Sequence, residues 1–370
     1  MKVVVAIDSF KGSLSSLEAG NAVKAAVLSL DASAEVIVKP LADGGEGTVD
    51  ALSAGGEAVE LTVCGPLQQP VKAKYCILKD TAVIEMAAAA GITLVTEKNP
   101  LETTTYGVGE LIRDAIGRGC RRFIVGIGGS ATNDGGTGML TALGYEFLDE
   151  GGRPIALGAK GLKDLHTIKT DRVLPELKAC MFRVACDVNN PLCGENGCSA
   201  VYGPQKGATP EMIEDMDRWL SRYADLSAAE YKNYPGAGAA GGLGFAFIAF
   251  TNATLQPGIQ IVLEEIALEQ DVRNADLVVT GEGRLDGQTV MGKAPIGVAR
   301  LAKKYHKPVI AFAGCVTEEA KACNDHGIDA YFPILRGITT LEEALKTENA
   351  YKNLYATAQQ VFRLIKTPTP

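Results

Sequence analysis

Short apolar runs alternate with amphipathic segments near the start of the chain. The first run, VVVAID at 3–8, precedes residues 16–30, whose apolar positions recur with the period of a helix. Ser15 and Glu18 have the spacing of a capping box, which predicts the start of that helix. A second run, EVIVKPL at 35–41, follows directly. This alternation predicts parallel β-α-β units.

The C-terminal part repeats the alternation. Its predicted strands are ADLVVTGEG, PVIAFAG and AYFPIL. Its predicted helices cover 295–305 and 318–326, and Thr340 with Glu343 caps a last one. We therefore expect an α/β fold with one doubly wound parallel sheet whose strands come from both ends of the chain.

The middle of the chain is richer in glycine and less regular. Strands are predicted at AVELTVCG, KAKYCIL, TAVIEMA, RRFIVGIGG and FRVACDV, together with a helix at 210–226 that Thr209 caps. A chain of 370 residues is long enough for two domains. We infer that residues 1–60 and 261–370 form one domain and that 61–260 form an inserted mixed α/β domain.

Composition excludes several classes of protein. The net charge of −8 without a basic tract argues against nucleic acid as a partner. Nine cysteines without C-x-x-C spacing indicate reduced thiols, and the opening VVVAI run is too short for a signal peptide, so we expect a cytoplasmic protein. The uncharged stretch 233–263 contains only FAFIAF as a strongly apolar run, so no membrane partner is expected.

Four loops that follow predicted strands carry the candidate chemistry, because open α/β sheets bind ligands at that edge. In DSFKGSLSS, Asp8 and Ser9 end a strand, and Lys11, Gly12 and Ser13 lead toward a helix. Backbone N–H groups at a helix start and the Lys11 charge would favour an anion. An ordinary βα turn is the alternative.

The second loop, PLADGGEGT, places two carboxylates among glycines. Its candidate residues are Asp43, Gly44, Gly45 and Glu46. Such a loop could hold a hydroxyl group or a hydrated Mg²⁺, and a plain surface turn is equally consistent with it. The third loop, GIGGSATNDGGTG, has the backbone N–H groups and hydroxyls of a phosphate cradle. Its candidates are Gly128, Gly129, Ser130, Thr132, Asn133 and Asp134.

The fourth loop, TGEGRLDGQTVMGKAP, contains Glu282, Arg284, Asp286 and Lys293. Residues 287–293 spell G-x-x-x-x-G-K, but alanine follows where a P-loop needs serine or threonine. The GAGAAG segment matches a dinucleotide fingerprint without the preceding strand, the three histidines lack metal spacing, and no G-x-S-x-G elbow occurs. Phosphoryl transfer fits these loops, since it needs positioning and charge neutralisation.

Several long motifs resemble the bacterial glycerate kinase family with two dissimilar α/β domains. They are DSFKGSLSS, PLADGGEGT, GGSATNDGGTGM, ACDVNNPLCG, VYGPQKGAT, GAGAAGGLGFA and ADLVVTGEGRLDGQT with GKAPIGVA, and they span nearly the whole chain. The resemblance implies a flavodoxin-like domain built from both chain ends and an active site in the cleft between the domains. It implies ATP- and Mg²⁺-dependent phosphorylation of D-glycerate, with 2-phosphoglycerate favoured over 3-phosphoglycerate.

The resemblance also suggests residue roles. Asp8 and Lys11 would face the phosphates or the glycerate carboxylate. Asp43 and Glu46, together with Asp187, would bind the metal or lie at the acceptor. Asn189 would come from the inserted domain.

Asp187 is the first candidate base and Asp286 its rival, because a kinase aspartate can accept the acceptor's hydroxyl proton. The loop from Ser130 to Asp134 would cradle nucleotide or substrate. Lys293 would neutralise developing charge. Arg284 would grip the glycerate carboxylate, with a surface ion pair as the alternative.

The sequence is also compatible with other functions. A kinase for another small hydroxy acid or polyol would use the same loops. A nicotinamide-dependent hydroxyacid oxidoreductase would need a fingerprint after a strand, and a solute receptor would need export. The sequence leaves open which loop binds ATP and whether the protein is a monomer or a homodimer.

Overall fold

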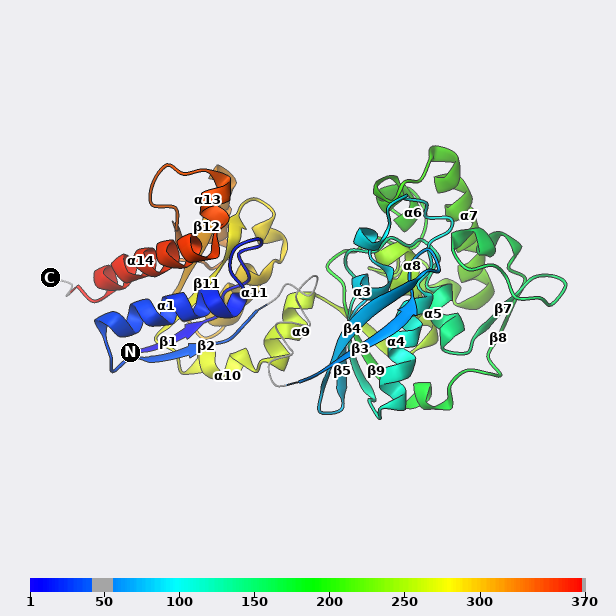
Figure 1. The fold of residues 1–370 in the computed structure, drawn as a ribbon, viewed down its shortest axis with the longest axis horizontal. Coiled ribbons are helices and arrows are strands. Elements are labelled where there is room, and N and C mark those ends of the chain that lie inside the picture. Colours follow the sequence, from blue (N-terminus) through cyan, green and yellow to red (C-terminus); the bar gives the residue numbers. More distant parts are fainter. Residues whose placement is uncertain (42–55, 368–370) are drawn as a thin grey trace. The chain divides into compact units, whose positions relative to one another are not determined.

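The structure of the chain, a computed structural model, describes residues 1–41 and 56–367 (Figure 1). It divides into two compact units, one combining Met1–Asp43 with Ile259–Pro370 and the other consisting of Gly44–Gly258. The strand that begins at Glu57 already belongs to the sheet of the second unit, so the first crossing of the chain comes before the predicted boundary at residue 60. An active site in a cleft between the domains stays a prediction.

The first unit is built on a parallel sheet in the order β13-β12-β11-β1-β2. The strands are β1 (Lys2–Val5), β2 (Glu35–Val38), β11 (Leu277–Leu285), β12 (Val309–Val316) and β13 (Ala330–Pro333). Counted along the chain within this unit, the order is 2-1-3-4-5, which is that of the flavodoxin fold. The predicted doubly wound sheet with strands from both chain ends is therefore confirmed.

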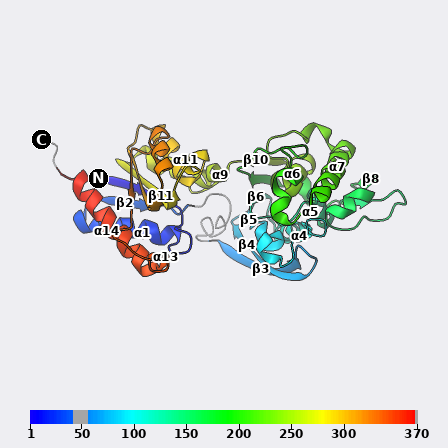
Figure 2. The same cartoon turned by 90° about the horizontal axis from the view of Figure 1, so that it is seen from above.

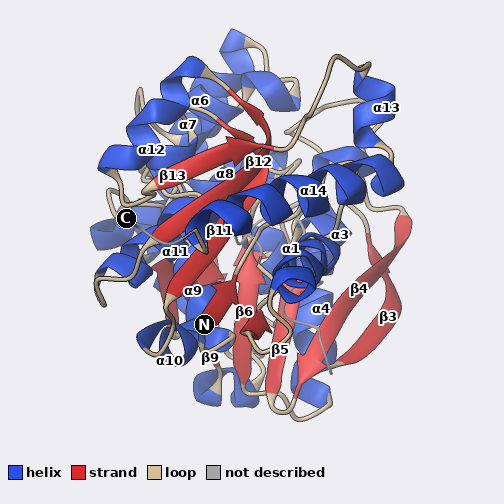
Figure 3. Ribbon diagram, turned by 90° about the vertical axis from the view of Figure 1, so that its left-hand side faces the viewer, coloured by secondary structure: helices blue, strands red, loops and turns tan. Residues whose placement is uncertain are grey.

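Helices cover both faces of this sheet. The helices of the first unit are α1 (Ser16–Leu30), α10 (Leu268–Arg273), α11 (Ala294–Lys303), α12 (Ala322–Asp325), α13 (Leu341–Leu345) and α14 (Thr347–Ile365), with α9 (Gly258–Glu265) at the crossing from the second unit. Helices α1 and α14 lie side by side on one face, and α11 lies on the other (Figures 2 and 3). Val23 and Val27 of α1 and Phe362 of α14 are buried against the sheet.

The second unit has a six-stranded mixed sheet in the order β10-β9-β6-β5-β4-β3. The strands are β3 (Glu57–Cys64), β4 (Pro70–Leu78), β5 (Thr81–Glu85), β6 (Arg122–Gly126), β9 (Met181–Ala185) and β10 (Ala253–Gln256), and a separate ribbon pairs β7 (Glu146–Leu148) with β8 (Thr167–Lys169). β5, β6, β9 and β10 run parallel, and β3 and β4 form an antiparallel hairpin on β5.

The helices of the second unit are α3 (Ala87–Ala90), α4 (Tyr106–Gly117), α5 (Thr137–Ala142), α6 (Cys198–Tyr202), α7 (Pro210–Ser227) and α8 (Ala239–Phe250). The FAFIAF run forms much of α8, and its Phe247 packs 5.5 Å from Phe182 of β9, measured between ring centroids. The run is apolar because it packs into the core of the unit. In residues 1–41 and 56–367, no helix is both long and apolar enough to cross a membrane.

Capping residues in the sequence mark the starts of α1, α7 and α13. The capping box of Ser15 and Glu18 is present at α1, and the Thr209 side chain accepts a hydrogen bond from the Met212 N–H at α7. The predicted last helix is in fact two, because α13 ends at Leu345 and the extended backbone of Lys346 separates it from α14. The predicted helix at 318–326 is a 3₁₀ turn followed by one turn of α12.

Candidate active site

The carboxyl ends of β1 and β11 bring two buried carboxylates to one edge of the first sheet. Asp8 follows β1, and its backbone N–H donates to the Gly281 carbonyl of β11 at 2.9 Å. Glu282 is the next residue along β11, and both acidic residues are only 7% exposed. Parallel strands present their carboxyl ends at the same edge, which is why residues far apart in sequence meet here.

Glu282 has an unusual proton affinity. The pKa of its carboxyl is raised from 4.5 to about 7. Burial is the main cause and the charges of Asp8 and Asp286 add to it, against the Thr289 hydrogen bond and the Lys293 charge, which lower the pKa. The Thr289 hydroxyl donates to its Oε1 at 2.7 Å, and Lys293 Nζ lies 3.9 Å from its Oε2. A carboxyl with a pKa near neutrality marks this edge as a candidate site.

The end of β11 and the loop after it add one more carboxylate and two cations. Asp286 lies 3.8 Å from Lys293 Nζ and 3.5 Å from Arg284 Nε, and it accepts the Gln288 N–H at 2.9 Å. The Arg284 side chain is 64% exposed, so its ion pair is a surface one and its head remains accessible to a ligand. Lys293 stands directly before α11, at the place that a P-loop lysine has before its helix.

The DSFKGS loop forms a tight turn before α1. The Phe10 N–H donates to Leu14 O at 2.8 Å, the Ser13 N–H donates to Phe10 O at 2.8 Å, and Gly12 has a φ of +81° that favours glycine. The Ser15 hydroxyl and the Glu18 carboxylate already close the first turn of α1. An anion at this loop would meet exposed Lys11 and the turn, and the binding of an anion at the start of α1 stays a prediction.

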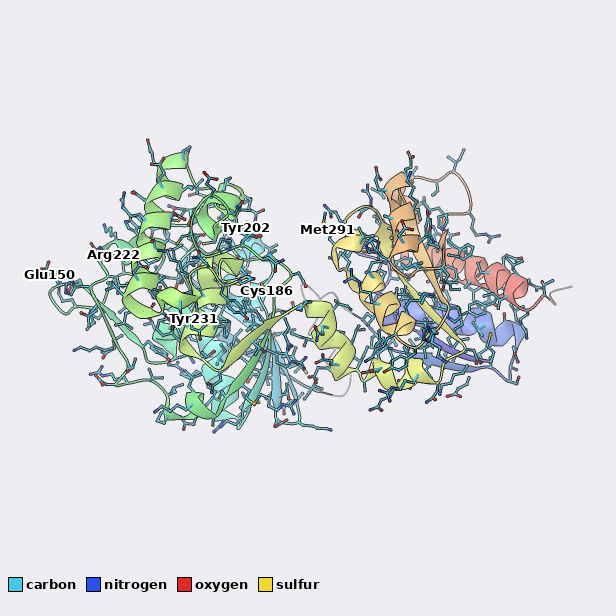
Figure 4. All side chains as sticks on the ribbon, turned by 180° about the vertical axis from the view of Figure 1, so that it is seen from behind. Glu150, Cys186, Tyr202, Arg222, Tyr231 and Met291 are labelled. Carbon is cyan, nitrogen blue, oxygen red and sulfur yellow. The ribbon has the colours of Figure 1, made fainter. Side chains whose placement is uncertain are left out.

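The second unit has a cavity of about 400 Å³ at the carboxyl ends of β6 and β9. Four predicted residues line it: Gly128, Gly129, Ser130 and Asp187. Much of the remaining wall is apolar, and it includes Ile92, Ile127, Ala185, Val188, Ala239 and Ala240. Figure 4 labels two further lining residues, Cys186 on the segment after β9 and Tyr202 at the end of α6.

Three of the predicted cradle residues lie behind this cavity. Thr132, Asn133 and Asp134 are completely buried. Asp134 accepts hydrogen bonds from the Thr105 N–H at 2.8 Å and from its hydroxyl at 2.9 Å, and burial raises the pKa of the Asp134 carboxyl. The Asn133 side-chain amide donates to Ser199 Oγ at 2.8 Å. The geometry gives these residues the task of shaping the loop whose Gly128–Ser130 part reaches the cavity.

Lys206 is a candidate that the sequence reasoning missed. It lines the cavity, is 2% exposed, and donates from Nζ to the Thr132 carbonyl at 2.6 Å. Burial lowers the pKa of its ammonium group to about 8. The only sequence signal was its place in VYGPQKGAT, because a single lysine in a short turn does not reveal that tertiary packing will bury it.

Asp187 and Asn189 lie on the segment after β9, and both are exposed. The Asp187 carboxylate accepts the Gly258 N–H at 3.0 Å. Gly258 is the last residue of the second unit. Asp187 thus lines the cavity and also holds the point at which the chain leaves this unit.

The glycines of GAGAAG have a packing reason. Ala240, Gly241 and Gly242 adopt left-handed φ values within α8, and a Cβ on Gly241 would lie 2.0 Å from the Thr132 carbonyl oxygen. The element directly before the segment is a 3₁₀ turn at Ala229–Tyr231 and not a strand, so the segment does not have the strand–turn–helix context of a dinucleotide site.

The structure gathers the predicted residues into two groups. Asp8, Glu282, Asp286 and Lys293 form a charged cluster in the first unit, and Gly128, Gly129, Ser130 and Asp187 line the cavity of the second. Asp43, Gly44, Gly45 and Glu46 lie outside the described residues. Within 1–41 and 56–367, no three acidic, cysteine or histidine side chains converge as a metal cluster.

Comparisons with known proteins point to one family. A family model described as Glycerate kinase family matches residues 3–366. A glycerate kinase of Haemophilus influenzae is 48% identical over 375 residues, covering 99% of each chain. The glycerate 2-kinase of Escherichia coli is 47% identical over 98% of this chain and 97% of its own.

A solved structure agrees with this family. The crystal structure of a glycerate kinase 2 candidate from Salmonella typhimurium LT2 has a TM-score of 0.91 and 48% identity, covering 99% of this chain and 98% of that one. The chain therefore belongs to the glycerate kinase family of phosphotransferase enzymes.

Proposed function

We propose that this enzyme transfers the γ-phosphoryl group of ATP to the 2-hydroxyl of D-glycerate and requires Mg²⁺. Family membership supports glycerate as the acceptor and a nucleotide as the donor. The Escherichia coli relative is a glycerate 2-kinase, which supports the 2-hydroxyl. The observation that carries the proposal is the cluster of Asp8, Glu282, Asp286 and Lys293 at the carboxyl edge of the first sheet.

This cluster fits a magnesium–phosphate group by its charge. Asp8 and Glu282 are buried carboxylates, and burial, with a smaller contribution from the Asp8 charge, raises the pKa of Glu282 to about 7. Mg²⁺ is usually held by one or two carboxylates together with substrate phosphates, so this pair is sufficient without a third protein ligand. Asp8 and Glu282 would hold the ion. Bound there, Mg²⁺ would neutralise charge on the transferring phosphoryl group.

The cations around the cluster have complementary tasks. Lys293, 3.9 Å from Glu282, would neutralise charge that develops on the phosphoryl oxygens. Lys11, on the exposed turn after β1, would bind phosphate or the glycerate carboxylate. Arg284 has the planar donor group that matches a carboxylate in a bidentate pair.

Two aspartates are proposed as the base. Asp187 and Asp286 each belong to one of the two groups of residues, and either carboxylate could accept the proton of the attacking hydroxyl. Replacing each aspartate in turn by asparagine distinguishes the two candidates. Loss of the base removes the rise of kcat with pH and leaves nucleotide binding intact, whereas loss of the other aspartate leaves that rise in place. Equal pH profiles for both variants and the unmodified enzyme would exclude both.

A product assay tests the proposed function. Purified enzyme is incubated with Mg²⁺, ATP and D-glycerate, and phosphorus NMR identifies the ester. We expect 2-phosphoglycerate and ADP, and no product once a chelator has removed Mg²⁺. An ester at the 3-position would refute the assignment of the 2-hydroxyl alone. Absence of any glycerate ester, with turnover of another hydroxy acid or polyol, would refute glycerate as the acceptor.

A further inference from the structure

We infer that the cavity of the second unit, between the ends of β6 and β9, binds the adenosine part of ATP. This inference rests on the proposed function, which requires a nucleotide donor but assigns it to no site. The cavity has about 400 Å³, which lies in the range of pockets that enclose drug-sized ligands. A nucleoside fills such a space, whereas glycerate is far smaller.

The wall chemistry favours a nucleobase over the acid. Ile92, Ile127 and Val188 provide an apolar wall, and Tyr202 adds an aromatic ring. An apolar wall suits the flat faces of a purine, while a carboxylate placed against this part of the wall would lose its hydration without compensation. The base therefore fits this part of the wall better than glycerate does.

The charged groups of the cavity lead to the same choice. The Lys206 ammonium donates one of its three hydrogens to the Thr132 carbonyl at 2.6 Å, so part of its hydrogen-bonding capacity is used by the protein. The Asp187 carboxylate also lines the cavity and would repel an acid. A carboxylate accepts hydrogen bonds from the hydroxyl or amino groups of a ligand, and a nucleoside presents both.

Two glycines at the edge of the cavity offer backbone N–H groups to the phosphates. Gly128 and Gly129 are exposed at the end of β6, and Gly129 has a φ of +70°. Glycines in such a turn let phosphates approach backbone N–H groups closely. Ala240, on the cavity wall, is held at a φ of +53°, a strained conformation for a residue with a side chain. Strain of this kind is concentrated at ligand sites.

Tyr202 gives the sharpest test. Its hydroxyl donates to Asn190 Oδ1 at 2.6 Å, which fixes the ring against the cavity. Base–aromatic stacking of the usual strength predicts that Tyr202→Ala weakens binding of a non-hydrolysable ATP analogue about 10-fold or more in calorimetry. Tyr202→Phe keeps the ring, so its affinity should stay within about threefold. The matched control is Tyr234→Ala, because Tyr234 belongs to the same unit, is 43% exposed and does not line the cavity.

A second variant fills the cavity with a larger side chain, whereas Tyr202→Ala enlarges the cavity. Val188→Trp should also weaken the ATP analogue and adenosine, with the KM for D-glycerate within about twofold of that of the unmodified enzyme. An unchanged nucleotide affinity in both Tyr202→Ala and Val188→Trp would overturn the inference. A raised KM for glycerate with nucleotide affinity intact would overturn it as well, by assigning the cavity to the acid.

The failure of the proposed function would look different. If the unmodified enzyme forms no glycerate ester but binds the ATP analogue, and Tyr202→Ala loses that binding, the acceptor is wrong and the nucleoside site stands. If the ester forms normally and all variants bind the analogue alike, the proposed function stands and the nucleoside site is wrong.

Discussion

Replacing Glu282 by glutamine should change how the stability of the first unit depends on pH. The carboxyl is 7% exposed, and burial together with the neighbouring carboxylates raises its pKa to about 7 from an ordinary value of 4.5. Between these pH values the folded protein keeps a proton that the unfolded chain has released. The free energy of unfolding therefore falls as the pH rises through this window.

The magnitude follows from the two pKa values. A difference of about 2.5, at about 1.36 kcal/mol for each pKa unit, makes the ionised Glu282 cost about 3 kcal/mol above pH 7. Glutamine has the same shape, can accept the Thr289 hydrogen bond of 2.7 Å and does not ionise. Relative to the unmodified enzyme, Glu282→Gln should be close to neutral at pH 4.5 and stabilising by about 3 kcal/mol at pH 8.

The assay is urea unfolding at several pH values, followed by hydrogen exchange in peptides from β11 so that the first unit is monitored by itself. Subtracting the free energy of unfolding of the unmodified enzyme from that of the variant at each pH removes the contribution of the other titrating groups. Glu318→Gln, which removes an equal charge at a side chain 87% exposed, is the control. Parallel pH profiles for Glu282→Gln and the unmodified enzyme would refute the reasoning, since they would mean that the carboxyl ionises as it does in the unfolded chain.

Lys11→Ala should lower kcat by about 100-fold or more if the lysine stabilises phosphoryl charge, whereas the exposed control Lys72→Ala should not change it; steady-state kinetics on folded variants decides. Asp187→Asn should have an effect of similar size, and near-normal turnover would exclude it as the base. Between pH 8 and 10.5 the folded protein has released the Lys206 proton and the unfolded chain still binds it, so stability should rise by about 3 kcal/mol over this range. Lys206→Met should abolish this rise in urea unfolding, and a rise that persists in the variant would contradict the burial argument. Gly241→Ala should destabilise the second unit by more than about 2 kcal/mol, since its Cβ would meet the Thr132 carbonyl at 2.0 Å, whereas Gly152→Ala, with an equally positive φ but open space, should cost only about 1 kcal/mol.

Local and periodic features were determined by the sequence alone. The capping box at Ser15 and the Thr209 cap depend on residues three positions apart, so they could be predicted without tertiary contacts. Alternating strands and helices with turn residues predicted the parallel sheet, because a β-α-β crossover permits few other arrangements. The motifs that resemble the glycerate kinase family are long and unusual, so their match to that family is specific.

Tertiary packing decided which candidates meet and which are buried. Asp8 and Glu282 lie 274 positions apart, and only the pairing of β1 with β11 places them together and raises the Glu282 pKa. In the sequence, the polar residues Thr132, Asn133 and Asp134 predict a ligand-binding loop. In the structure their side chains are completely buried. Lys206 is the converse case, an ordinary lysine in the sequence that packing places at the wall of a cavity. Burial and charge proximity are properties of the assembled sheets, and no short stretch of sequence contains them.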